Sequence, residues 1–363
     1  MIPDFAALRA IGWPHDGWPP ADDPWAASMA TYPAGRPARV VEQHRSGYVV
    51  AEDIDTSYAI ESLPDWQRPR LPADQRPAVG DWLLVAGEAG GNAHALALLP
   101  RRTTIKRSSA GKHYGQQIIA ANIDVVFIVC SLDGDFNPRR IERYLLLVRG
   151  GAHPVVVLTK TDLADAGSTL GELEAQQVDV CAVDARNPES TTGLERWLGP
   201  GTTAVFVGSS GVGKSTLTNT LSGVHRMKTG AVRASDARGR HTTTHRALIP
   251  LASGACLIDT PGMRELKPTG EEDLAEDGFA DIEALATACR FRDCRHDSEP
   301  GCAVRAAIDT GTLEPGRFAN YKKLRDEITG AADQLATHNA RRGNEKRTAG
   351  GPRKVSRPPR RRS

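Results

Sequence analysis

The eight residues GSSGVGKS, from Gly208 to Ser215, match the phosphate-binding pattern G-x-x-x-x-G-K-[ST] in full. An apolar, strand-like run precedes them and a helix-like run follows, which is the context that this pattern requires. Glycines let the backbone curl so that its N–H groups point at phosphate oxygens. Lys214 would reach the β and γ phosphates, and the Ser215 hydroxyl would bind Mg²⁺. The alternative is a purely structural glycine-rich turn. The predicted phosphate site consists of Gly208, Ser209, Ser210, Gly211, Val212, Gly213, Lys214, Ser215 and Thr216.

A downstream motif, LIDTPG, predicts the magnesium side of the same site. Asp259 would hold Mg²⁺ through water, and the N–H of Gly262 would contact the γ phosphate. Between the two motifs lies the polar segment ARGRHTTTH (237–245), whose composition is typical of a switch that becomes ordered around γ phosphate and Mg²⁺. One threonine of this segment should complete the metal shell, and the register with the next strand favours Thr243. The alternatives to it are Thr242 and Thr244. The predicted magnesium ligands are Ser215, Thr243 and Asp259.

The run TKTD follows another apolar strand, PVVVL, and predicts the loop that reads the base. The Asp162 carboxylate can accept two hydrogen bonds from the N1–H and exocyclic amine of guanine, and adenine offers neither donor on that edge. ATP is therefore disfavoured. The stem of Lys160 would lie along the base plane. Thr159 stands where Asn is usual, and it keeps a hydrogen-bonding side chain. The predicted base-side residues are Thr159, Lys160, Thr161 and Asp162. The segment VDA (183–185) is a second candidate base-contacting loop.

The base-reading motif precedes the phosphate loop in this chain. In most GTP-binding chains the phosphate loop comes first, so the order here is reversed. A chain whose original ends are joined and which is opened elsewhere keeps its sheet, provided that both events occur in surface loops. Here the cut falls between DTPG and TKTD. The segment that senses γ phosphate therefore leads directly into a cluster of cysteines.

That cluster, CRFRDCRHDSEPGC, has the spacing C-x4-C-x-H-x5-C. Three thiolates and one imidazole form a closed tetrahedral set, which is typical of structural Zn²⁺ and leaves no ligand position for chemistry. The alternative is three reduced thiols beside a surface histidine. The predicted zinc ligands are Cys289, Cys294, His296 and Cys302. Four arginines flank them and indicate either a nucleic-acid contact or a solvated basic surface. These are Arg290, Arg292, Arg295 and Arg305.

The sequence predicts a cytoplasmic protein without a membrane span. The 363 residues contain no apolar run long enough to cross a bilayer, and the N-terminus lacks the features of a secretion signal. The formal net charge is +2, but residues 341–363 contain ten basic residues and one acidic residue. A basic end of this kind indicates a polyanionic partner.

The pattern of apolar and polar residues along the chain predicts an α/β protein in five parts. Short alternating runs predict a small β barrel, for which an oligonucleotide-binding fold and a barrel without a nucleic-acid role are both open. Continuous apolar strands that alternate with helices predict a parallel sheet covered on both faces. The expected parts are an N-terminal extension (1–37), an OB-fold β barrel (38–105), a circularly permuted P-loop G domain (106–268), a helical zinc-binding domain (269–338) and a basic disordered tail (339–363).

The combination TKTD, GSSGVGKST, GRHTTTH, DTPG and C-x4-C-x-H-x5-C behind a small barrel resembles the RsgA (also YjeQ) family of bacterial GTPases. The resemblance covers residues from about Ala38 to about Leu335. It implies GTP with Mg²⁺, a structural zinc ion, and a role in late maturation of the small ribosomal subunit, bound to its rRNA. We also expect a monomer. Asp184 departs from the pattern, since Ser is more usual there.

The expected reaction is attack of water on the γ phosphate of GTP, which depends on positioning and charge stabilisation. Many GTPases orient this water with a Gln directly after D-x-x-G, but Met263 stands there and cannot do so. Slow hydrolysis by the free protein and stimulation by the ribosome are therefore expected. His241, in the switch-like segment, is the candidate catalytic residue, and the resemblance points to the same histidine. A structural or RNA-contacting role for His241 stays open.

Two other functions remain as alternatives. The first is a GTP-binding, rRNA-binding assembly factor in which hydrolysis is incidental, and Met263 favours it. The second is a permuted GTPase that acts on the large subunit, and the barrel-first layout and the zinc motif disfavour it.

Overall fold

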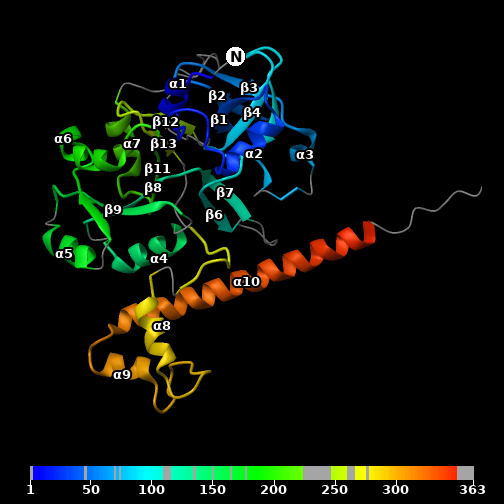
Figure 1. The fold of residues 1–363 in the computed structure, drawn as a ribbon. Coiled ribbons are helices and arrows are strands. Elements are labelled where there is room, and N and C mark those ends of the chain that lie inside the picture. The colour runs from blue at the N-terminus through cyan, green and yellow to red at the C-terminus, as the bar shows by residue number, and fades with distance from the viewer. Residues whose placement is uncertain are drawn as a thin grey trace, which may run out of the picture.

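The computed structural model describes residues 3–44, 47–68, 71–72, 75–108, 116–133, 136–148, 151–163, 166–175, 178–223, 247–259, 266–274 and 278–349. Within these ranges the chain forms a small barrel, a parallel sheet with helices on both faces, and a helical C-terminal part (Figure 1). None of the helices in these ranges combines the length and apolar character needed to cross a bilayer.

The parallel sheet carries the predicted nucleotide motifs at its strand ends. Its strands are β8 (Val125–Ser131), β9 (His153–Thr159), β10 (Asp179–Ala182), β11 (Thr203–Val207) and β13 (Cys256–Asp259). They lie in the order β10-β9-β8-β11-β13, all parallel, and β12 (Ala247–Pro250) pairs antiparallel with β13. The expected parallel sheet is thereby confirmed. Because the carboxyl ends of parallel strands share one edge, the ends of β8, β9, β11 and β13 lie side by side.

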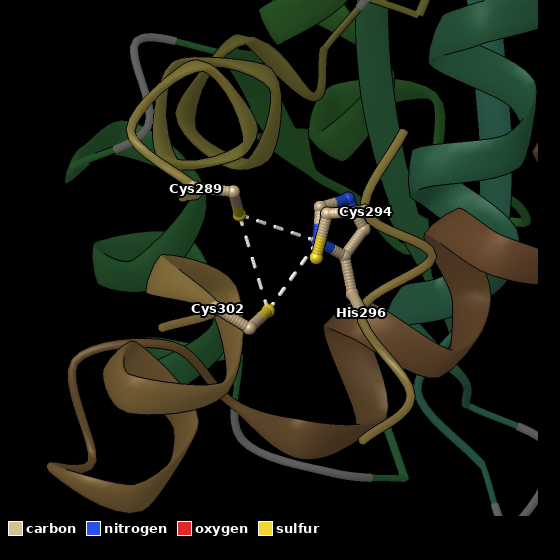
Figure 2. Close-up of side chains that lie close together, drawn as sticks. All are labelled: Cys289, Cys294, His296 and Cys302. Atoms are coloured by element: carbon tan, nitrogen blue, oxygen red, sulfur yellow. Dashed lines mark hydrogen bonds between the residues drawn. The ribbon is translucent and has the colours of Figure 1, made fainter. Parts of the chain in front are cut away.

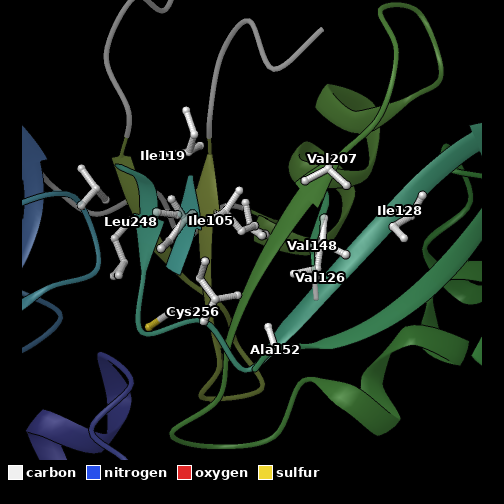
Figure 3. Packing of buried hydrophobic residues seen from close by; sticks show 14 of the residues in the cluster. Ile105, Ile119, Val126, Ile128, Val148, Ala152, Val207, Leu248 and Cys256 are labelled. Atoms are coloured by element: carbon white, nitrogen blue, oxygen red, sulfur yellow. The ribbon is translucent and has the colours of Figure 1, made fainter. Parts of the chain in front are cut away.

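Helices cover both faces of this sheet, as the continuous apolar strands require, since successive side chains of a strand point to opposite faces. Val126, Ile128 and Val156 pack on one face with α4 (Pro138–Val148) and α5 (Gly167–Ala175). Phe127 and Val155 pack on the other face with the 3₁₀ helix η2 (Thr192–Trp197) and with α7 (Lys214–Ser222). The short helix α6 (Pro188–Thr191) lies against these two helices. Figure 3 shows part of the first of the two cores, including Ile128 of β8 and Val207 of β11.

The five short alternating runs form the barrel strands. They are β1 (Arg36–Gln43), β2 (Tyr48–Ala51), β3 (Ser57–Ile60), β4 (Trp82–Ala86) and β5 (His94–Leu98). β1 pairs with β2 and β4, β2 with β3, and β4 with β5. A parallel bridge between Glu61 and His94 brings the end of β3 to β5 and closes the ring. The short helix α3 (Pro64–Gln67) adds Trp66 to the barrel core. A single pair, Glu42 with Ala247, joins β1 to β12 and so connects the barrel to the parallel sheet.

The N-terminal extension is more ordered than its lack of periodicity indicates. It contains α1 (Phe5–Ala10) and α2 (Pro24–Thr31), whose first turns are capped by Asp4 and Asp23. Trp13 and Trp25 are buried and their rings lie 5.0 Å apart, and Trp13 also packs edge-on against Trp82 of the barrel at 4.8 Å. Aromatic packing of this kind holds a segment that sequence periodicity does not identify.

Two expected domain limits fall inside regular elements. The hairpin of β6 (Thr104–Ser108) and β7 (Gln116–Ala121) spans the limit at residue 105. The helices α8 (Ala280–Thr287), α9 (Ala303–Asp309) and α10 (Pro315–Ala349) follow, and α10 passes through the limit at residue 338. The expectation of disorder from residue 339 is therefore wrong up to residue 349. Ala, Arg, Lys and Glu favour a helix in this stretch, and the first Gly-Gly-Pro, a strong helix breaker, comes only at 350–352. Residues 350–363 lie outside the described ranges.

Candidate nucleotide-binding site and metal centre

The phosphate loop connects the end of β11 to the start of α7, as its sequence predicts. Gly208 has a φ of +144°, and a Cβ built there would lie 2.3 Å from the carbonyl oxygen of Val129 on β8. Gly213, with a φ of +101°, occupies the N-cap position of α7. Both positions require glycine, because an L side chain rarely adopts such angles. The loop therefore curls tightly around the N-terminus of a helix, which is a favourable place for anions.

Lys214 lies against the loop that precedes it. Its Nζ donates to the carbonyl oxygen of Gly208 at 2.8 Å and also to that of Ser209. Ser210, Gly211 and Ser215 are exposed along the same turn. An ammonium group held inside an accessible loop, at the N-terminus of a helix, is suited to bind the phosphates of a nucleotide.

The base-reading loop is attached directly to the phosphate loop. Thr159, which ends β9, is fully buried, and its Oγ1 donates to the carbonyl oxygen of Val212 at 2.6 Å. Lys160 then adopts a left-handed conformation (φ +62°), and a hydrogen bond from the N–H of Leu163 to its carbonyl oxygen closes a turn. This turn leaves Asp162 exposed, where it can meet a ligand. The hydroxyl of Thr159, which stands where an Asn side chain is usual, therefore joins the base-reading loop to the phosphate loop.

The loop after β10 is hydrogen-bonded to the helix that follows the phosphate loop. The carbonyl oxygen of Ala185 accepts a hydrogen bond of 2.7 Å from Thr220 of α7. The Asp184 carboxylate accepts one from the N–H of Arg186, at 3.0 Å, so it also shapes its own turn. Thr220 was not identified from the sequence, because a single helix threonine carries no pattern.

The structure places Asp259 beside the phosphate loop. It ends β13, the direct parallel neighbour of β11, with Val205 opposite Ile258. The side chain is half-buried at the edge where the loops meet. The predicted residues His241, Thr243 and Gly262, together with Met263, lie outside the described residues.

The predicted zinc ligands come together (Figure 2). The sulfur and nitrogen ligand atoms of the four residues lie within 4.8 Å of one another. The Nδ1 atom of His296 is 3.6 Å from the sulfur of Cys289 and 3.4 Å from that of Cys302, and these two sulfurs are 3.9 Å apart. Ligands at about 2.3 Å (sulfur) and about 2.0 Å (nitrogen) from an ion at the tetrahedral angle would be about 3.5 to 3.8 Å apart. The donor set and its spacing therefore fit a tetrahedral metal ion.

The surroundings of this centre act differently on its cysteines and fix its loop. Burial raises the pKa of Cys289, but hydrogen bonds from the backbone amides of Ala303 and Val304 and from the neighbouring thiols lower it, and the net shift is downward. Burial raises the pKa of Cys294 to about 11. Cys302 caps α9 and accepts from the N–H of Arg305 at 3.4 Å. The Glu299 carboxylate accepts several backbone N–H groups of the loop, its own included, and these lower its pKa to about 2.

Comparison with known proteins agrees with this geometry. A family model described as RsgA GTPase matches residues 98–269. A curated protein of Xanthomonas euvesicatoria, named small ribosomal subunit biogenesis GTPase RsgA, is 63% identical over 364 aligned residues, which cover 99% of each chain. A protein of Xanthomonas oryzae with the same name is 62% identical, again over 99% of each chain.

Two solved structures share the fold. The crystal structure of YjeQ from Thermotoga maritima has a TM-score of 0.57 at 23% identity, and the match covers 82% of this chain and 99% of that one. The structure of YloQ, described as a circularly permuted GTPase, has a TM-score of 0.54 at 23% identity, with 83% and 96% covered. The fold is therefore a circularly permuted P-loop GTPase fold, with an N-terminal barrel and a C-terminal helical part that carries the metal centre. Because the chain is 63% identical to a curated RsgA protein over 99% of both chains, it belongs to the RsgA GTPase family.

Proposed function

We propose that this protein is a GTP hydrolase that acts late in the biogenesis of the small ribosomal subunit, binds its rRNA and is released or switched when GTP is hydrolysed. The observation that carries the nucleotide part is the hydrogen bond between Thr159 and the carbonyl oxygen of Val212, which unites the base reader and the phosphate loop. The names of the curated relatives support the ribosomal part.

The predicted residues have distinct tasks in this proposal. Asp162 reads the guanine edge, and the stem of Lys160 lies along the base. Lys214 and the N–H groups of residues 208–216 bind the phosphates. Ser215 and Asp259, with Thr243, would hold Mg²⁺, which would neutralise charge that develops on the β and γ phosphates. The Gly262 N–H contacts the γ phosphate.

Hydrolysis in the proposed mechanism requires a partner. Met263 offers no hydrogen bond to orient the attacking water, so turnover by the free protein is slow. His241 positions this water once the small subunit has bound. The same methionine is the observation that favours a second candidate function, in which GTP is bound by an rRNA-binding assembly factor and its hydrolysis is incidental.

The metal centre is proposed to hold one structural zinc ion, since thiolate and imidazole ligands select zinc and all four positions are filled. Metal analysis of the purified protein that found less than one zinc per chain would contradict this. The barrel and the arginines around the centre are proposed to contact rRNA. We further propose a cytoplasmic monomer that does not associate with membranes.

Lys214→Ala separates the two candidate functions. In a switch, the variant should bind GTP at least tenfold more weakly, because a charged partner of the phosphates is lost, and it should fail to cycle on and off small subunits. Sedimentation of subunits with wild type and variant, with GTP or a non-hydrolysable analogue, measures this. If the variant docks and releases normally, the binding-factor function is correct and the switch is not.

A further inference from the structure

The loop after β8 contributes a side chain to the base reader that no nucleotide motif contains. β8 and β9 are parallel neighbours with Ser131 opposite Thr159, so the residues just beyond both strands lie next to each other. The N–H of Leu132 donates to the carbonyl oxygen of Thr159 at 3.0 Å and locks this register. The next residue on each side is Asp133 and Lys160.

The carboxylate of Asp133 binds the ammonium of Lys160 through Oδ2. Its other oxygen, Oδ1, accepts a hydrogen bond of 2.8 Å from the hydroxyl of Ser131. The carboxylate is therefore itself oriented, by a residue at the end of a buried strand. Both side chains of the pair are about one third exposed, at 31% each, so water screens the attraction only in part.

The side chain of Lys160 gains order from this partner. Lys160 is a left-handed residue at the start of a tight turn, and a lysine has several rotatable bonds that are free in solution. A mobile lysine side chain would lose conformational entropy each time a base bound. A side chain that is already held at its ammonium loses less entropy on binding, so the nucleotide binds more tightly.

We propose that Asp133 is a positioning residue for the guanine site: it holds Lys160 by its ammonium so that the lysine stem forms one wall of the slot for the base. This inference rests on the proposed function, because it requires a guanine nucleotide in that slot. GTP and GDP carry the same base, so Asp133 acts equally on the affinity for both and has no part in the hydrolytic step.

Asp133→Asn tests the proposal, since it removes the charge and keeps the shape. The affinity for GDP and GTP should both fall about fivefold, the size expected for a partly exposed ion pair. Competition with a fluorescent guanine nucleotide measures the two affinities. With small subunits present, KM should rise by a similar factor and kcat should stay unchanged. Asp133→Glu should recover most of the affinity, because a longer carboxylate still reaches the flexible ammonium.

Asp179→Asn is the matched control. Asp179, which begins β10, pairs at 2.6 Å with His153, which begins β9, so this pair lies at the end of β9 opposite Lys160. The control variant should leave nucleotide affinity unchanged. In a Lys160→Ala background, Asp133→Asn should have no further effect. Affinities within twofold of wild type for Asp133→Asn, a loss equal to that of the control, or full additivity with Lys160→Ala would each overturn the proposal. If wild type itself binds no guanine nucleotide, the proposed function fails, and this inference fails with it.

Discussion

At the scale of single residues, Thr159 shows how one side chain can unite two loops. It is the last residue of β9, it is fully buried, and its hydroxyl reaches the phosphate loop. A hydrogen bond between buried groups contributes about 1 kcal/mol, and loss of the donor also leaves the acceptor unpaired. The base reader and the phosphate loop therefore each depend on the other for their geometry.

Thr159→Val should weaken guanine-nucleotide binding about tenfold, because it removes the hydroxyl and keeps the branched shape. Competition with a fluorescent nucleotide gives the affinity. Thr203→Val is the control: Thr203 is also fully buried, and its Oγ1 has no hydrogen-bond partner among the described residues. That control should leave the affinity unchanged and stability unchanged or improved. Equal losses in both variants would show that the bond to Val212 has no role in binding.

At the scale of elements, α4 connects the nucleotide-binding sheet to the metal-bearing helices. Its buried residues Ile141 and Val148 face the sheet, whereas Leu146 belongs to the core of the C-terminal part. Polar contacts extend this interface, because Glu142 accepts hydrogen bonds from Arg139 of α4 and from two residues of α10. The two are Arg317, at 2.9 Å, and Asn320, at 2.6 Å. The Glu142 carboxylate is therefore one of the groups that join the two elements.

Glu142→Gln should destabilise this interface by about 1 to 3 kcal/mol, since two arginines lose a largely buried charged partner. Glu327→Gln at the same interface should cost less, because Glu327 is more exposed (33% against 13%) and pairs with Arg143 at 2.7 Å. Thermal unfolding and limited proteolysis between the sheet and α10 measure both effects. A larger cost for Glu327→Gln would contradict this account of the interface.

The sequence predicts the phosphate loop, the base reader, the metal ligands and the parallel sheet, because each depends on local spacing or periodicity. It does not predict the Asp133–Lys160 pair, whose members come together only through the register of two parallel strands. The tryptophans of the N-terminal segment indicate partial order there, but the sequence does not predict that they pack against Trp82, far along the chain. Contacts of this kind depend on the three-dimensional arrangement, and one sequence contains no signal for them.

At the scale of the whole molecule, the permuted chain order connects the γ-phosphate side of the site to the metal centre. The chain leaves β13 at Asp259 and reaches Leu266, whose carbonyl oxygen accepts a hydrogen bond of 3.2 Å from Arg143 of α4. The same arginine binds Glu327 of α10. Leu266, which follows β13 by only a few residues in the sequence, is therefore hydrogen-bonded to α4, and α4 in turn contacts α10. We propose that the nucleotide state acts on the C-terminal part, and through it on the ribosome, by this route.

The most direct test of this account is GTP hydrolysis by the purified full-length protein, alone and with isolated small or large ribosomal subunits. The account predicts slow turnover by the free protein, stimulation of at least tenfold by small subunits, and none by large subunits. An equal rate in all three conditions, or stimulation by large subunits alone, would contradict the proposal that the small subunit completes this GTPase site.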